Sequence, residues 1–156
     1  MKQAIADLII AIIELLRKNK TEAAPFLPTT RKRIHWIVLQ NTLRRDFPDA
    51  QVYMSKEWYS LANFEDMQEF LRLDNTDKHH YNLDSYRCSD FAFRLKGQLS
   101  VPGWSDLTHG LFWTTTHAMI SIIDQNMDKW YIEPQTDSIE KRLQDWQGKK
   151  CRLIVM

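Results

Sequence analysis

The sequence predicts an α+β domain in which a helix that begins at a cysteine packs on an antiparallel sheet. Apolar residues at three-and-four spacing, typical of amphipathic helices, recur in residues 64–73 and in the stretch that starts at Cys88. Runs of β-branched and aromatic residues predict strands at residues 114–123, 129–133 and 151–155. With 156 residues, 44% of them hydrophobic, the chain is long enough to bury one compact core.

The N-terminal segment is set apart by a proline-containing loop. Residues 4–16 form a strongly apolar amphipathic pattern that includes Asp7 and Glu14, and the pattern is shorter than the ~20 residues needed to cross a bilayer. We therefore expect a helix and linker at residues 1–30, a domain at residues 31–156, and no membrane span. The helix would pack on the domain or on a partner. No secretion signal is recognised, which favours a cytoplasmic protein.

The charge balance argues against nucleic acid as a partner. The chain has 21 basic and 20 acidic residues, a formal charge of +1, so no long-range field would attract a polyanion. The short basic run at residues 31–33 is typical of a solvated helix start. Two cysteines are too few for a disulfide framework, and we expect both to be reduced.

The first half of the domain predicts two helices and one short strand. Residues 34–43 favour a helix that ends before Pro48, and residues 51–54 favour a strand. The helix at residues 64–73 would be capped by Asn63, whose side-chain oxygen accepts a bond from the first turn. A polar loop follows it.

The cysteine helix is the segment that points most directly to chemistry. Its residues 86–92 read YRCSDFA, and Asp84 or Ser85 would cap it. One face carries Cys88, Phe91, Ala92 and Leu95. A thiol at a helix N-terminus near an imidazolium has its pKa lowered from ~8.5 into the range ~3.5–7.5, which favours a nucleophilic thiolate. The alternative for Cys88 is a small buried core residue.

A hairpin would supply the base and the group that orients it. If the turn is centred on Gln125, His117 lies opposite Glu133 and Met119 lies opposite Tyr131. A carboxylate on one ring nitrogen selects the tautomer whose other nitrogen accepts the thiol proton. The diagonal separation of ~7–8 Å leaves the imidazole and carboxylate within reach even with a register error of one pair.

A second histidine and the end of the chain complete the pattern. His109 stands in a glycine-flanked loop without a strand carboxylate, so His117 is favoured as the base. Glycine and proline at Gly97 and in residues 102–103 indicate turns. Residues 138–146 favour a helix that Gly148 ends, before the closing strand.

Metal ligands give only weak signals. His79 and His80 are adjacent, point to different sides and lack a third ligand at zinc spacing, so a solvated pair is favoured over a zinc site. Aspartates near the cysteine, among them Asp84 and Asp90, are oxygen ligands that suit calcium, but they lack the fixed loop of an EF-hand. The thiol chemistry itself requires no cofactor.

Three segments carry a resemblance to a known family: residues 81–92, His117 with Ala118, and residues 132–137, which read IEPQTD. In these the chain resembles the papain-like cysteine peptidase domain at the C-terminus of the Marasmius mushroom agglutinin and of its bacterial and phage relatives. The resemblance implies a papain-like fold and a Cys88, His117 and Glu133 triad.

The resemblance also implies further site residues. Gln135 would line the site, and Asn82 stands where a side-chain amide would stabilise the oxyanion. Calcium is a possible cofactor by the same resemblance, because the fungal member resembles a calcium-activated peptidase, but Arg87 occupies a position where relatives often carry aspartate, which argues against calcium dependence in this chain.

The sequence thus predicts a cysteine hydrolase, a thiol peptidase or amidase, that acts on a peptide or amide. Cys88 would attack the carbonyl, His117 would protonate the leaving amine, and water would hydrolyse the thioester. The alternative is a non-catalytic phage or bacterial structural or binding module that retains the fold.

Overall fold

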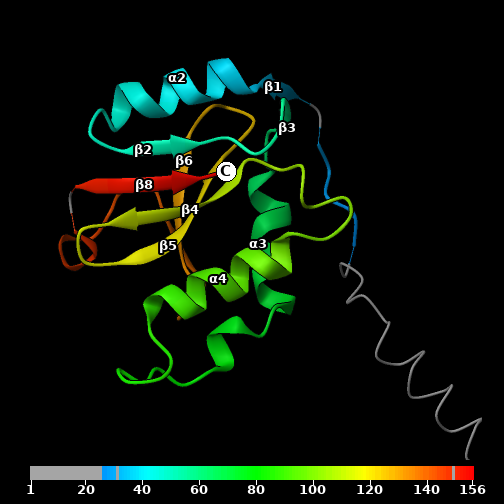
Figure 1. Ribbon diagram of the computed structural model, residues 1–156. Helices are drawn as coiled ribbons and strands as arrows, with labels where there is room; N and C mark the ends of the chain where they lie inside the picture. The colour runs from blue at the N-terminus through cyan, green and yellow to red at the C-terminus, as the bar shows by residue number, and fades with distance from the viewer. Residues whose placement is uncertain (1–25, 31, 149) are drawn as a thin grey trace, which may run out of the picture.

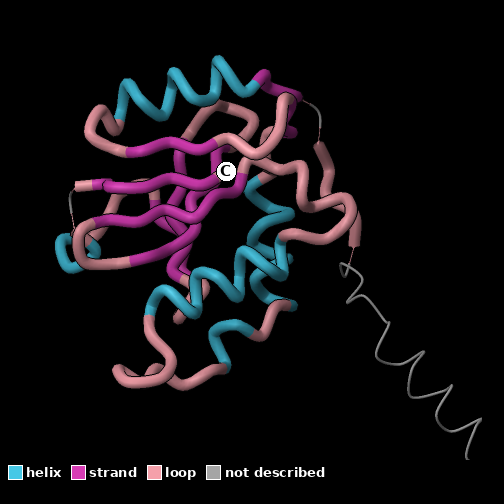
Figure 2. Tube along the Cα trace, in the orientation of Figure 1, coloured by secondary structure: helices cyan, strands magenta, loops and turns pink. Residues whose placement is uncertain are grey.

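The fold has three layers, in which helix α2 covers one face of a six-stranded sheet and helices α3 and α4 cover the other (Figure 1). It is seen in a computed structural model that describes residues 26–30, 32–148 and 150–156. Figure 2 shows that the helices lie outside the strands, which form the middle of the molecule. The mixed α+β class expected from the sequence is confirmed.

Among the described residues the α-helices all precede Ser100, and five of the six strands of the large sheet follow them. In order, the described elements are β1 (Arg33–His35), α2 (Trp36–Asp46), β2 (Gln51–Tyr53), β3 (Trp58–Ser60), α3 (Phe64–Leu73), η1 (Thr76–Lys78), α4 (Cys88–Leu99), β4 (His109–Thr114), β5 (Ala118–Ile123), β6 (Lys129–Glu133), β7 (Ser138–Glu140), η2 (Asp145–Gln147) and β8 (Cys151–Val155).

The large sheet has the strand order β2-β8-β4-β5-β6-β7. All its neighbouring strands are antiparallel except β2 and β8, which pair in parallel, so the predicted antiparallel sheet is corrected at this edge. Strands β1 and β3 form a separate antiparallel pair.

Two apolar clusters hold the layers together. On the α2 face, Leu39 and Leu43 pack with buried strand residues such as Phe112. On the other face, α3 and α4 pack against Ile120 and Ile132. Because β5 is buried on both faces, it reads as a continuous apolar run rather than an alternating one.

Several elements form where the sequence predicts them. Helix α3 spans residues 64–73, and Asn63 Oδ1 accepts a hydrogen bond from Asp66 N at 3.2 Å, which is the predicted cap. Strands β2, β6 and β8 form within their predicted segments. Both cysteines are free thiols.

The first helix prediction is wrong at its start, although the helix ends before Pro48 as expected. Ile34 and His35 belong to strand β1, because Ile34 pairs with Tyr59 of β3, a strand that we did not predict. The helix α2 then begins at Trp36 and continues to Asp46. The predicted turn at Gly97 is also wrong, since α4 runs through it to Leu99.

The predicted strand at residues 114–123 is divided. Its first residue ends β4, which begins at His109, and a turn leads into β5 at Ala118. The predicted loop around His109 is therefore a strand start. The hairpin register is also shifted, because Ser121, not Met119, lies opposite Tyr131.

The predicted helix at residues 138–146 does not form. Residues 138–140 pair with β6, where Glu133 lies opposite Ser138. Asp137 adopts a φ of 58°, a left-handed conformation that reverses the chain into strand β7. A short 3-10 turn, η2, occupies only the end of the predicted span, and Gly148, with a φ of 83°, ends it.

The start of the described chain lies against the domain. Phe26 packs edge-on against Trp104 with ring centroids 5.2 Å apart, and the Trp104 indole donates to the Phe26 carbonyl at 2.7 Å. The predicted helix at residues 4–16 lies outside the described residues. In the described part of the chain, no helix is long and apolar enough to cross a membrane.

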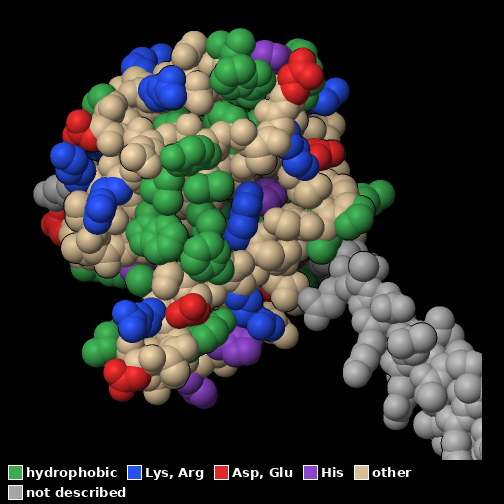
Figure 3. All heavy atoms as spheres, in the orientation of Figure 1, with side chains coloured by type: hydrophobic (Ala, Val, Ile, Leu, Met, Phe, Trp, Pro, Cys, Tyr) green, Lys and Arg blue, Asp and Glu red, His purple; other side chains and the backbone are tan. Residues whose placement is uncertain are grey.

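One face of the sheet leaves hydrophobic side chains at the surface (Figure 3). Tyr53 lies opposite Val155, and Trp113 lies opposite Leu153, so these side chains share a face beside α4. Phe93 of α4 packs edge-on against Trp113, with ring centroids 5.6 Å apart.

Candidate functional site

The site is built on a contact between His117 and Glu133. His117 Nε2 lies 2.6 Å from Glu133 Oε2, and both side chains are buried, 7% and 4% exposed. The imidazole precedes β5 and the carboxylate ends β6, two strands that pair directly. A carboxylate oxygen can only accept, so the proton of the neutral ring lies on Nε2. Nδ1 is then the ring nitrogen that can accept a hydrogen bond from a ligand.

Two glutamines complete the hydrogen bonding of the Glu133 carboxylate. Gln147 Nε2 donates to Oε2 at 3.2 Å, and Gln135 Nε2 donates to Oε1 at 3.3 Å. The Gln135 backbone N–H also donates to Oε1, at 3.4 Å. Each carboxylate oxygen therefore has donors, which offsets the cost of burying it.

Thr114 holds the turn that presents His117. Its hydroxyl oxygen accepts from the backbone N–H of His117 at 3.0 Å and donates to the carbonyl of Gln147. The Thr114 N–H in turn donates to the His117 carbonyl at 2.9 Å. The Thr114 side chain thus connects the end of β4 to the η2 turn, which contains Gln147.

An aromatic ring covers the imidazole. Trp146 packs edge-on against His117 with ring centroids 4.9 Å apart, yet the indole remains 60% exposed. Beside it is an open pocket of about 390 Å³. The pocket is lined by Tyr131, Glu133, Gln135, Thr136, Ser138, Glu140, Gln144, Trp146 and Gln147. The lining combines a flat exposed ring with amides, hydroxyls and two carboxylates, and it includes no lysine or arginine.

Cys88 is the first residue of α4, as the sequence predicts, and its free thiol is half-buried. It packs against the same apolar cluster as Ala118, the residue that follows His117. In Figure 1 α4 and β5 both begin at the left side of the molecule. Within the described ranges, Cys88 Sγ makes no hydrogen bond to His117, so the structure joins only two of the three predicted residues directly.

The cap of α4 differs from the prediction. Asp90 Oδ2 accepts a hydrogen bond from the backbone N–H of Arg87 at 2.8 Å. This bond caps the start of α4, and neither Asp84 nor Ser85 is the capping residue. Asn82 closes the preceding turn: its Oδ1 accepts from Asp84 N at 2.9 Å and from Ser85 N at 3.2 Å. The side-chain oxygen Oδ1 of Asn82 therefore makes its hydrogen bonds within this turn.

No metal centre is formed by the described residues. Among residues 26–30, 32–148 and 150–156, no group of three or more histidine, cysteine or acidic side chains is arranged to hold an ion. Asp84 and Asp90, the calcium candidates, lie on either side of the α4 start, and Asp90 serves the helix cap.

A carboxyl group near the site has an unusual environment. Burial, reinforced by the charges of Asp77 and Asp74, raises the pKa of Asp137 to about 7. This residue forms the turn that follows Glu133 and Gln135. Burial also raises the pKa of the Tyr131 phenol to about 12, so that group is neutral at physiological pH.

Trp146, Gln144 and Gln147 are site residues that the sequence-based reasoning missed. They were placed in or beside a predicted helix, whereas they lie on the η2 turn before Gly148. The signal available was the short polar and aromatic run directly before a glycine, since Gly at such a position commonly ends a helical turn.

Comparison with known proteins finds several solved structures that are similar to this chain. One of them is a PSL1a-E64 complex: its TM-score is 0.70, the identity is 15%, and 81% of this chain and 51% of that chain are covered. Another is Polyporus squamosus lectin bound to the human-type influenza-binding epitope Neu5Acα2-6Galβ1-4GlcNAc, with a TM-score of 0.65, 15% identity, and 81% and 50% covered. No family model matches the chain. No curated protein matches it either.

At this identity the likeness shows the fold alone, and the chain spans about half the length of the structures that it matches. The comparisons correct the sequence-based interpretation. The similar structures are of a lectin, and nothing among them identifies a papain-like cysteine peptidase. The resemblance to the papain-like peptidase domain and the resulting prediction of a cysteine hydrolase with a catalytic triad are therefore withdrawn. The peptide or amide substrate is withdrawn with them.

Proposed function

We propose that this domain is a non-catalytic binding module whose ligand is a neutral saccharide. The observation that carries the proposal is the exposed ring of Trp146 beside a pocket of planar polar groups. A pyranose ring has an apolar C–H face and a rim of hydroxyls. The first packs on an aromatic face, and the second bonds to amides and carboxylates.

The size and composition of the pocket fit this ligand class. Its volume of about 390 Å³ is at the lower end of the range for small-ligand sites, roughly 300–1,000 Å³. Gln135 and Gln144 supply amides, and Thr136 and Ser138 supply hydroxyls at the rim. One of the similar structures is a lectin bound to a sialylated trisaccharide, which supports a saccharide over a peptide as the class of ligand but does not bear on its being neutral.

The charge of the lining favours a neutral sugar over an acidic one. Glu133 and Glu140 line the pocket, with no cationic side chain among the lining residues. A ligand carboxylate would face like charge there, which disfavours binding. We therefore expect neutral oligosaccharides to bind more tightly than their sialylated counterparts.

The His117 and Glu133 pair has a supporting role in this proposal. It holds the base of the pocket in one arrangement, because the imidazole packs on Trp146 and the carboxylate accepts from Gln135 and Gln147. The thiol of Cys88 is not required. Binding should therefore be unaffected by Cys88→Ala.

The test is a glycan array followed by isothermal titration with the neutral sugars that score highest. Trp146→Ala should weaken binding at least about tenfold, because the ring provides the stacking surface. Trp58→Ala is the matched control, since Trp58 is 44% exposed and belongs to the β1–β3 pair. Failure of every neutral glycan to bind, or loss of binding in Cys88→Ala, would overturn the proposal.

A further inference from the structure

A second pocket, of about 700 Å³, opens where β8 pairs with the end of β4. It is lined by Asp49, Gln51, Trp113, Thr114, Thr115, Lys150, Arg152 and Leu153. None of these residues lines the pocket near Trp146, so the two pockets are separate sites. The volume lies within the range for small-ligand sites, roughly 300–1,000 Å³. The pocket therefore has room for a ligand of its own.

A β-bulge brings two consecutive residues of β8 into this pocket. Trp113 of β4 pairs with Leu153. The next residue of β4, Thr114, pairs with Cys151, so Arg152 is the extra residue of β8. Consecutive residues of a regular strand point to opposite faces, whereas a bulge re-aims a side chain. Arg152 and Leu153 both line the pocket as a result.

Trp113 and Leu153 form the apolar wall of the pocket. The wall continues onto the surface through Tyr53 and Phe93, which are 58% and 51% exposed. Figure 3 shows hydrophobic side chains gathered on this face, with basic side chains beside them. A flat aromatic ring would pack on such a wall. The hydroxyl rim of a sugar would instead meet apolar side chains that offer no hydrogen bonds.

Lys150 and Arg152 give the lining its positive charge. Both side chains are exposed. Lys150 Nζ lies 3.2 Å from Asp49 Oδ2, and solvent screens this exposed ion pair. Within residues 26–30, 32–148 and 150–156, Arg152 forms no ion pair with a carboxylate. The lining therefore has one more cation than it has carboxylates, whereas the pocket near Trp146 has carboxylates alone.

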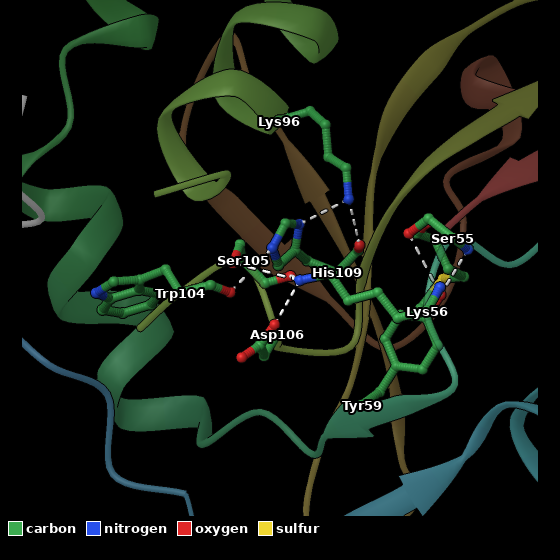
Figure 4. Close-up of polar contacts among 9 residues, drawn as sticks. Ser55, Lys56, Tyr59, Lys96, Trp104, Ser105, Asp106 and His109 are labelled. Atoms are coloured by element: carbon green, nitrogen blue, oxygen red, sulfur yellow. Dashed lines mark hydrogen bonds and ion pairs between the residues drawn. The ribbon is translucent and has the colours of Figure 1, made fainter. Parts of the chain in front are cut away.

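The lysines at the other end of β4 differ from Arg152, because they are bound within the protein (Figure 4). Lys96 Nζ donates to the His109 carbonyl oxygen at 2.7 Å and lies 3.0 Å from Nδ1 of the same residue. Lys56 Nζ forms an ion pair with Asp106. The donors of these two lysines are used internally. The guanidinium of Arg152 keeps its N–H groups for a ligand.

We propose that this second pocket binds an aromatic compound that carries a phosphate or carboxylate group. The ring packs on Trp113 and Leu153. The anion accepts hydrogen bonds from the Arg152 guanidinium, whose planar fork matches both phosphate and carboxylate. Lys150 adds attraction at the rim, and the exposed Thr115 hydroxyl is a further donor. The inference is independent of the saccharide proposal, because the two pockets share no lining residue.

The test is isothermal titration of the full chain with α-naphthyl phosphate and with α-naphthoate. The tighter of the two identifies the preferred anion. α-Naphthol has the ring without the charge, and inorganic phosphate has the charge without the ring. Each should bind at least about tenfold more weakly than the preferred naphthyl anion. Added salt should weaken binding of the anion, because the site is exposed. The proposal is overturned if neither naphthyl anion binds, or if naphthol or inorganic phosphate binds equally well.

Variants locate the binding in this pocket. Arg152→Gln should weaken binding of the preferred anion at least about tenfold. Arg44→Gln is the matched control, since Arg44 is an exposed arginine of α2 that does not line the pocket. Trp113→Leu keeps an apolar side chain but removes the flat ring, and it should weaken binding several-fold.

Trp146→Ala distinguishes this inference from the saccharide proposal. It should leave the affinity for the naphthyl anion within about twofold of wild type, because the two sites are separate. Loss of anion binding in Trp146→Ala would place the ligand in the other pocket and overturn the proposal. Wild-type affinity in Arg152→Gln would overturn it equally, since the guanidinium would then not hold the anion.

Discussion

His117 and Glu133 meet although they are not directly opposed across the β5–β6 pair. The register places Ile120 opposite Ile132, so continuing it would set Glu133 against Met119, two residues from the imidazole. The side chains nevertheless close to 2.6 Å between Nε2 and Oε2. A diagonal pair of long side chains can bridge the ~7–8 Å between such positions, so the contact does not depend on direct opposition.

Glu133→Gln should destabilise the domain by about 1–3 kcal/mol, measured by urea unfolding. The carboxylate accepts from His117, Gln135 and Gln147. In the glutamine variant, an NH2 group replaces one of the two carboxylate oxygens. This donor then faces an N–H donor of a neighbouring side chain, and neither buried donor has an acceptor. Glu140→Gln is the control, because this exposed residue lies at the edge strand. Equal stability of the two variants would contradict the proposed role of the carboxylate.

The contact between His117 and Glu133 was predictable from sequence because it needs only a hairpin of approximately known turn. The exact register was not, since a turn centred on Gln125 and one centred on the next residue differ by little in local preference. The same limit explains why the positions of Trp146 and Gln147 were not predicted. Their position depends on pairing between β6 and β7, a tertiary interaction that overrides the helical preference of residues 138–146.

Glu140→Gln should also reduce discrimination against acidic sugars. Glu140 lines the pocket, so its charge opposes a ligand carboxylate there. Removing the charge is expected to raise the affinity for a sialylated oligosaccharide several-fold relative to its neutral counterpart. Titration of both sugars against wild type and variant measures the ratio. An unchanged ratio would show that Glu140 does not set the preference.

Asp137→Asn should stabilise the protein most near neutral pH. The folded pKa is raised from 3.8 to about 7, so the native state holds a proton that the unfolded chain loses above pH 3.8, and stability falls as pH rises through this window. Asparagine has no such charge and tolerates the φ of 58°. The melting temperature should rise by roughly 2–4 °C at pH 7, with little change near pH 4. A uniform rise at both pH values would point to conformation alone.

Replacing glycine by alanine should have opposite effects on the free energy of unfolding at Gly97 and at Gly148. At Gly97, inside α4, a Cβ meets nothing within 4 Å, so Gly97→Ala should stabilise by about 0.5–1 kcal/mol. At Gly148 the φ is 83° and a Cβ would lie 2.6 Å from Thr116 Oγ1. Gly148→Ala should cost about 1–3 kcal/mol and displace the neighbouring η2 turn. Denaturant unfolding of both variants tests the pair, and a stabilised Gly148→Ala would contradict the described turn.

The buried histidine of β4 should make the domain sensitive to acid. Burial lowers the folded pKa of His109 from 6.5 to about 3. Between these values the unfolded chain binds a proton that the native state does not, so stability is lost as pH falls below about 6.5. The expected slope approaches, at most, about 1.4 kcal/mol per pH unit.

Urea unfolding at several pH values measures that slope in wild type and in His109→Gln. Glutamine retains one acceptor for Lys96 and one donor for the Trp104 carbonyl, but it does not titrate, so the slope should flatten in this variant. His79→Gln is the matched control, since His79 is exposed and its replacement should leave the wild-type slope intact. If His109→Gln keeps the full slope, another group is responsible for the acid sensitivity. Because Asp137 acts in the opposite sense over part of the same range, the comparison should be repeated in the Asp137→Asn background.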